Sequence, residues 1–229
     1  MSENETRHTL GPFENALNAL RSNVFMMSSL AERGMNNALR GLFERDDDLC
    51  NIAIADDEEI DLLEMQIDRE GVDIMLRFQP VAEDLRQVVS SMKISVNLER
   101  IADQSVAIAR RARKLNQQPA IAEVHYLDAM FAKANSMYAD AMKAFADRDV
   151  ELAKTIKARD KELDQLNHDI TDRYTDCMQQ HPAAVREYMN LIFIARSIER
   201  VGDHATNIAE DAFYAITAED IRHNQEPVN

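Results

Sequence analysis

The amino-acid sequence predicts an all-α protein built from two tandem antiparallel three-helix bundles. The chain has 229 residues but only five glycines and five prolines, so it offers few positions for sharp turns or strand ends. Its apolar residues recur at alternating spacings of three and four, which is the period of an amphipathic helix. The second half of the chain also repeats the first at an offset of 100 to 103 positions, and such a repeat indicates two copies of one helical unit.

The first half of the chain predicts three long helices with identifiable ends. The dipeptide Gly11-Pro12 marks the start of the first helix. The second is expected over about 49–76, because the acidic run Asp46-Asp47-Asp48 supplies an N-cap and first-turn charges. Pro80 ends this helix by removing a backbone donor, and the third helix follows over about 83–115.

The second half predicts three more helices. They are expected over about 120–145, from about 150 to 180, and over about 185–215. Short connections make neighbouring helices antiparallel. We therefore expect a first bundle at residues 12–117 and a second at residues 118–218. Each bundle should fold nearly independently, because the apolar stripes of three helices can close on one another.

The two halves resemble each other most closely in the third helix of each bundle. The segment Leu98-Glu-Arg-Ile-Ala-Asp103 corresponds to Ile198-Glu-Arg-Val-Gly-Asp203, one hundred positions later. On the second helix of each bundle, Asp61 corresponds to Asp164. This correspondence fixes which side chains of the two bundles occupy equivalent places.

Composition excludes several classes of protein. The chain has 26 basic and 41 acidic residues and a net charge of −15, so it repels phosphate backbones and is not expected to bind nucleic acid. Cys50 and Cys177 are far apart and belong to no Cys/His cluster, which argues against a zinc finger or a disulfide framework. The N-terminus has no apolar signal region and no stretch is long enough to span a bilayer. We therefore expect a cytoplasmic protein without direct membrane insertion.

Two repeat-matched pairs of carboxylates are the sharpest candidate site. Glu99 and Asp103 are four residues apart, as are Glu199 and Asp203, so each pair shares one face of a helix. Like charges at this spacing destabilise a helix by a few tenths of a kcal/mol. A cation bound between them would reverse that effect, and this predicts two metal sites.

Ordinary ion pairs are the alternative explanation for these acids. Arg100 can pair with Asp103, and Arg200 with Asp203, although a surface pair contributes only about 0.5 kcal/mol. The same spacing also occurs at Glu64, outside the repeated motif. What favours a metal site is the recurrence of the motif at matching positions in both halves.

The two motif helices resemble those of a known family. The string Ala195-Arg-Ser-Ile-Glu-Arg-Val-Gly-Asp-His-Ala-Thr-Asn-Ile-Ala-Glu210, with its partner Asn97-Leu-Glu-Arg-Ile-Ala-Asp-Gln-Ser-Val-Ala-Ile-Ala109, is similar to the signature helices of the PhoU family, accessory regulators of bacterial phosphate transport. The resemblance implies two three-helix bundles and E(D)xxxD motifs that hold iron or zinc. It therefore implies Glu99, Asp103, Glu199 and Asp203 as metal ligands. Ala102 and Ala107 replace the Gly202 and Asn207 of the second copy, which predicts a weaker first site.

The resemblance also implies what the protein does. It would be a non-enzymatic negative regulator of the phosphate-starvation response. It would couple a phosphate ABC transporter to a sensor histidine kinase by contacting the ATPase subunit of the transporter and the kinase. We also expect a homodimer.

Three other functions are alternatives that the residues suggest. A ferritin-like carboxylate metal protein needs Glu-x-x-His pairs on two helices, and the predicted helices contain none. A plain helical scaffold would leave the acids solvated. A phosphotransfer module would use His168 or His204, although a histidine on a helix is more often an ordinary polar residue. No Ser/His/Asp arrangement, Gly-rich loop or Walker-type lysine indicates an enzyme.

Two features leave alternatives open. Asp61 and Asp164 could complete multinuclear metal sites or could be exposed polar positions. Gly202 lies in the middle of a predicted helix, where glycine costs about 1 kcal/mol relative to alanine. It is explained either by close approach of the helix to a neighbour or an ion, or by simple tolerance.

Overall fold

The computed structural model describes residues 3–221, and the side chains from Gly11 onward. Within that range the chain is almost entirely helical and contains no strand. The helices are α1 (Glu3–Phe43), α2 (Asp47–Ala55), α3 (Asp57–Phe78), α4 (Ala82–Asn116), α5 (Leu127–Asp147), α6 (Val150–Gln180) and α7 (Val185–Thr217), with short 3-10 segments at Ala122–Tyr126 and Pro182–Ala184. The prediction of an all-α fold is confirmed.

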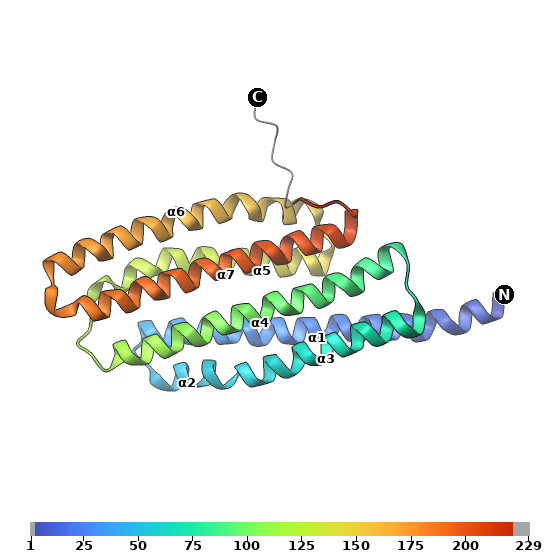
Figure 1. Ribbon diagram of the computed structural model, residues 1–229, viewed down its shortest axis with the longest axis horizontal. Helices are drawn as coiled ribbons and strands as arrows, with labels where there is room; N and C mark the ends of the chain where they lie inside the picture. The colour runs from blue at the N-terminus through green and yellow to red at the C-terminus, as the bar shows by residue number, and fades with distance from the viewer. Residues whose placement is uncertain (1–2, 222–229) are drawn as a thin grey trace, which may run out of the picture.

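The helices form two antiparallel bundles that lie side by side (Figure 1). Helices α1 to α4 make the first bundle, and α5, α6 and α7 make the second. In Figure 1, α4 and α7 run next to each other through the middle of the molecule, while α3 and α6 lie at its opposite outer edges. This arrangement brings the two helices that carry the repeated motif together.

The helix expected over 49–76 is two helices, so that prediction was wrong. Helix α2 ends at Ala55 and α3 begins at Asp57. Between them, Asp56 accepts two hydrogen bonds of 2.9 Å from the guanidinium of Arg33 on α1, and this bidentate contact holds the chain at the break. The predicted N-cap is confirmed, because Asp46 accepts from the backbone N–H of Asp48 at 2.8 Å.

Two predicted helix starts were also wrong. The first helix begins at Glu3, and Pro12 lies inside it rather than at its start. A proline with helical φ loses one backbone hydrogen bond, and a long helix can continue through that loss. The helix expected from 120 begins at Leu127. Before it, Arg45 donates a hydrogen bond of 2.6 Å to the carbonyl of Asn116, the last residue of α4, and another to the linker carbonyl of Gln118. The start of the linker is therefore bound to the first bundle and does not begin a helix.

The two bundles share one apolar core. Leu98 and Ile101 of α4 and Ile194 and Ile198 of α7 are all buried in the same cluster. The apolar stripes of each repeat therefore do not close only on themselves. Independent folding of each bundle stays a prediction. A separated bundle would have to fold with the apolar surface of the shared core exposed to water.

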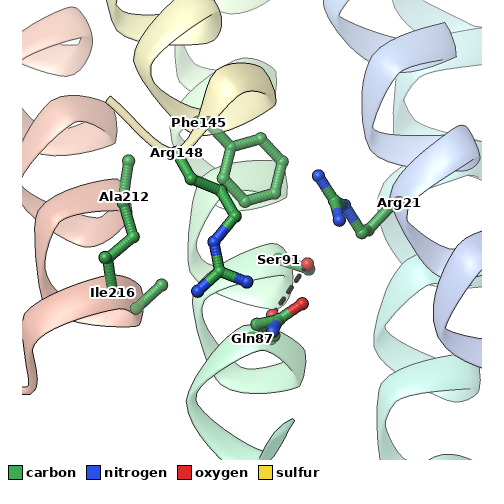
Figure 2. Close-up of a pocket in the computed structure, with 8 residues that line it drawn as sticks. Arg21, Gln87, Ser91, Phe145, Arg148, Ala212 and Ile216 are labelled. Carbon is green, nitrogen blue, oxygen red and sulfur yellow. Dashed lines mark hydrogen bonds between the residues drawn. The ribbon is translucent and has the colours of Figure 1, made fainter. Parts of the chain in front are cut away.

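A small pocket marks one end of the contact between the bundles. Figure 2 shows Arg21 of α1 and Arg148, at the end of α5, on either side of the Phe145 ring. The guanidinium carbon of Arg21 lies 5.8 Å from the centre of that ring, and Arg148 forms an ion pair with Glu83 of α4. These contacts tie the bundles together away from the repeated acidic motifs.

No helix in the described range has the length and apolarity that a membrane span requires.

Candidate metal centre

The repeated motifs lie on the two central helices. Glu99 and Asp103 belong to α4, and Glu199 and Asp203 belong to α7. Each glutamate directly follows a buried core residue, Leu98 or Ile198. The carboxylates therefore stand at the edge of the apolar core, as the sequence predicted.

The second bundle brings three carboxylates together. One oxygen each from Asp164, Glu199 and Asp203 lies within 4.8 Å of the other two. Asp164 comes from α6 and the other two from α7, so the cluster spans two helices. The question left open for Asp164 is answered in part, because its carboxylate faces the motif.

Gly202 explains how α6 comes so close to α7. A Cβ atom added to Gly202 would lie 2.2 Å from Cδ2 of Leu163, the residue before Asp164. Leu163 is fully buried. The close approach of a neighbour that was proposed for Gly202 is confirmed, and it is this approach that sets Asp164 opposite the motif.

Burial and mutual repulsion disfavour ionisation of the second cluster. Burial, together with the charges of Glu199, Asp160 and Asp164, raises the pKa of Asp203 to about 7, although Arg200 opposes the shift. Burial, followed by the charge of Asp164, also raises the pKa of Glu199. A bound cation would remove the repulsion among these groups.

Asp160 is a fourth acid at this site that the sequence reasoning missed. Its Oδ1 atom is buried. Burial, followed by the charge of Asp164, raises its pKa, although Thr206, a hydrogen-bonding neighbour, opposes the shift. The signal was available, because Asp160 and Asp164 form a DxxxD pair that matches Asp57 and Asp61 in the first repeat.

The first bundle arranges its acids differently. Burial, together with the charges of Asp103, Glu64 and Asp61, raises the pKa of Glu99 to about 7, although Arg100 opposes the shift. Arg100 contacts both motif acids, with its Nε 3.3 Å from Glu99 and its Nη1 3.2 Å from Asp103. Within residues 3–221, no third carboxylate joins this pair as closely as Asp164 joins the second. The arginine occupies the place that a cation would take.

Both motifs open onto one polar groove between the central helices. Asp103, Asp160 and Asp203 all line it. Within the groove, His204 Nδ1 lies 3.1 Å from Oδ1 of Asn97, and the side-chain amide of Asn207 donates to the same oxygen at 3.3 Å. These polar contacts join α4 to α7 between the two acidic motifs.

His204 and His168, the histidines that a phosphotransfer module would use, each lie beside a polar side chain. Burial lowers the pKa of His204, and the charges of Arg100 and Arg200 lower it further. His168 is exposed on α6 and lies 3.6 Å from Asp172, one turn further along the same helix. Each histidine has an ordinary polar partner.

The donor set of the second cluster fits a metal ion. It offers only carboxylate oxygens, one each from Asp164, Glu199 and Asp203. Oxygen donors suit hard cations such as iron(III), manganese or magnesium, whereas structural zinc more often uses cysteine and histidine. Metal binding stays a prediction, and iron matches the donors better than zinc does.

Comparison with known proteins places the chain in a family. The PhoU domain matches residues 25–112 and again 127–212, one match for each repeat. The phosphate-specific transport system accessory protein PhoU homolog of Pseudomonas putida is 34% identical over 225 residues, which are 96% of this chain and 87% of that protein. PhoU of Escherichia coli K12 is 33% identical over 223 residues, or 97% of this chain and 92% of that protein.

Solved structures agree with these matches. The crystal structure of PhoU from Pseudomonas aeruginosa superposes with a TM-score of 0.88 at 33% identity, covering 90% of this chain and 100% of that one. The phosphate transport system regulatory protein PhoU from Streptococcus pneumoniae superposes with a TM-score of 0.82 at 25% identity, covering 91% and 99%. The names of these relatives describe accessory and regulatory proteins, not enzymes. With two domain matches, near-complete relatives and the same fold, this chain belongs to the PhoU family.

Proposed function

We propose that this chain is an accessory regulator of phosphate transport that holds down the phosphate-starvation response by protein contact. The names of its relatives support an accessory role in a phosphate-specific transport system. The architecture is compatible with that role, since it offers long helical faces and a polar groove.

Its partners would be the ATPase subunit of a phosphate ABC transporter and a sensor histidine kinase, and it would act as a homodimer in the cytoplasm. The groove between α4 and α7 is the feature that best supports contact with partners of this kind. It places carboxylates and arginines of both repeats on one surface, so its charge can be matched by a partner.

The acidic motifs would hold metal ions, iron or zinc. Asp164, Glu199 and Asp203 would bind the ion in the second bundle, and Glu99 and Asp103 would bind one in the first. A bound ion supplies positive charge and no catalytic step. The carboxylate residues would orient their oxygens toward the ion. In the first bundle, Arg100 would first have to break its ion pairs with Glu99 and Asp103.

Metal content separates this proposal from its alternatives. Glu199→Gln with Asp203→Asn removes the ligand charge while keeping similar shapes, and Glu99→Gln with Asp103→Asn is the matched change in the first repeat. We expect metal to be lost mainly in the first of these variants, as measured by elemental analysis of protein purified without chelator. If neither double change alters the metal content, the acids do not bind metal. They would then form only ordinary ion pairs, as in a plain helical scaffold. Loading with many iron atoms per chain would favour the ferritin-like alternative.

The regulatory role is tested in cells. We expect this chain, expressed in Escherichia coli that lacks its own PhoU, to lower the transcripts of phosphate-starvation genes at high phosphate. Affinity purification at high and at low phosphate would recover the transporter ATPase and the kinase. Starvation transcripts that stay high despite normal levels of folded protein would contradict the proposal.

A further inference from the structure

Helix α3 has a second apolar stripe that faces away from the core. Its inward face is formed by buried residues such as Ile60 and Ile67. Four large apolar side chains on the other side are exposed, with relative accessibilities of 57% for Leu62, 46% for Met65, 46% for Val72 and 73% for Leu76. We call these four side chains, with Arg69 between them, the α3 stripe.

The spacing of the α3 stripe is that of a helix-pairing seam. Its positions 62, 65, 69, 72 and 76 alternate by three and four, which is the a/d pattern of a heptad. The stripe spans four turns, or about 21 Å. A surface depression beside it is lined by Val72, Leu76 and Met92 of α4, and such a depression can receive a side chain from a second helix.

The internal repeat shows that bundle architecture does not require this stripe. On α6, the positions equivalent to Leu62, Met65, Val72 and Leu76 are exposed and polar: Gln165, His168, Thr175 and Gln179. Helices α3 and α6 occupy the corresponding outer edges of their bundles (Figure 1). An apolar surface present in one repeat and absent from its structural equivalent indicates a contact specific to the first bundle.

The charges around the stripe restrict what can cover it. Asp61 and Asp68 lie along one flank and Asp73 along the other, and α3 as a whole has eight acidic and two basic side chains. Anionic lipid would be repelled by these acids. A second copy related by a two-fold axis would set α3 acids against α3 acids. Residues 222–229 contain a single aliphatic residue, Val228, and so cannot provide a matching stripe.

We propose that the α3 stripe docks one amphipathic helix of another protein, whose own apolar stripe is flanked by lysine or arginine. The basic flank complements Asp61 and Asp68, whereas Asp73 already pairs with Arg77 at 2.8 Å. The apolar seam covers the exposed aliphatic side chains. Arg69 interrupts the seam, so the partner carries an acidic residue opposite it, which sets the register. The interface uses neither acidic motif of the α4–α7 groove.

The internal repeat provides the decisive variant. Leu62→Gln, Met65→His, Val72→Thr and Leu76→Gln together give α3 the residues that α6 already has at these positions. Because all four side chains are exposed, the fold should be retained, which circular dichroism and thermal melting can check. Gln165→Ala with Thr175→Ala makes comparable surface changes on α6 and serves as the control.

The probe is a synthetic amphipathic peptide of about three heptads. It has leucine at the a and d positions, one glutamate at a central a position and lysine at e and g. A second peptide has glutamate in place of every lysine. Fluorescence polarisation with the full chain should show that the lysine peptide binds at least about tenfold more tightly than the glutamate peptide, and more weakly at high salt. The fourfold variant should lose about tenfold in affinity, and the α6 control should lose none.

Several results would overturn the proposal. The proposal is wrong if the unaltered chain and the fourfold variant bind the lysine peptide equally well. It is also wrong if neither of them binds it. A dimer of the unaltered chain that the variant cannot form would also overturn it, since the stripe would then be a self-interface. Sedimentation with neutral phosphatidylcholine vesicles that is lost in the variant would make it a membrane contact. Peptide binding should persist in the Glu199→Gln, Asp203→Asn double variant, so failure here is distinct from failure of the metal proposal.

Discussion

Gly202 on α7 and Leu163 on α6 are in such close contact that a methyl group on the glycine would lie 2.2 Å from Cδ2 of the leucine. Leu163 is fully buried, so its side chain has little room to move aside. The next residue along α6 is Asp164, which joins the carboxylate cluster. Packing in the core and geometry at the candidate metal centre therefore depend on the same contact.

Replacing Gly202 by alanine should destabilise the protein. Overpacking a well-filled core costs about 1–3 kcal/mol, whereas the better helix propensity of alanine returns only about 1 kcal/mol. We expect a net loss of about 1 kcal/mol in the free energy of unfolding, measured by urea denaturation. Ala102→Gly at the equivalent position of the first repeat is the reverse change and should also destabilise, because it loses about 1 kcal/mol of helix propensity and a buried methyl group of about 0.8 kcal/mol. A Gly202→Ala protein more stable than the original would mean that Leu163 turns aside freely.

Asp164 and Asp61 are equivalent in sequence and should differ in metal binding. Asp164 lies with Glu199 and Asp203, so Asp164→Asn removes a ligand and should weaken metal affinity by about tenfold or more. Asp61→Asn should have a smaller effect, because Asp61 is not part of so close a cluster. Competition between each variant and a chromophoric chelator would measure both affinities. Equal losses in the two variants would contradict the difference between the two bundles.

The metal-free protein should become less stable as the pH rises. The pKa values of Glu99 and Asp203 are about 7 in the folded protein, against about 4 for such groups in an unfolded chain. Their contribution to stability is complete below about pH 4 and is lost as the pH rises through about 7, because the unfolded chain releases these protons first. Thermal melting in chelator between about pH 5 and pH 8 should show this fall. Asp203→Asn should flatten it, and a melting temperature that rises over this range would refute the sign.

The buried contact between Ser28 and Tyr138 should couple the two bundles. The hydroxyl of Tyr138 on α5 donates to the backbone carbonyl of Ser28 on α1 at 2.8 Å, and the two hydroxyl oxygens are 2.7 Å apart. Tyr138→Phe removes both hydrogen bonds and leaves the buried Ser28 hydroxyl without this partner, so it should cost about 1–3 kcal/mol in the free energy of unfolding. In a double-mutant cycle, Ser28→Ala should add less than its separate effect. Strict additivity would argue that the hydrogen bond contributes little to docking of the bundles.

The sequence predicted the fold well because its helix breaks have local causes. Pro80 and Pro182 lie where helices end or begin, and proline acts through its own backbone. The break between α2 and α3 was missed because its cause is not local. It depends on Arg33, which is 23 residues away along the chain from Asp56.

The candidate site was predicted in part for a similar reason. The i, i+4 spacing is sufficient to place Glu199 and Asp203 together on one helix. It cannot say which acids of a neighbouring helix face them, since that depends on how closely the helices approach. Here the approach depends on Gly202, and Asp160 and Asp164 follow from it. The matched DxxxD pairs on α3 and α6 were a visible signal that was overlooked.

Both acidic motifs occur at the midpoints of their helices. Glu99 is the central residue of α4, and Val201, between Glu199 and Asp203, is the central residue of α7. Each motif is therefore about 20 Å or more from the nearest helix end, far from the termini and connections where backbones open most readily. The groove lies between two long, continuous helices, α4 and α7. We therefore expect ion binding there to leave the backbone unchanged. The arrival of an ion would reduce the negative charge of the groove and leave the helices in place, so a partner would detect the altered charge rather than a movement.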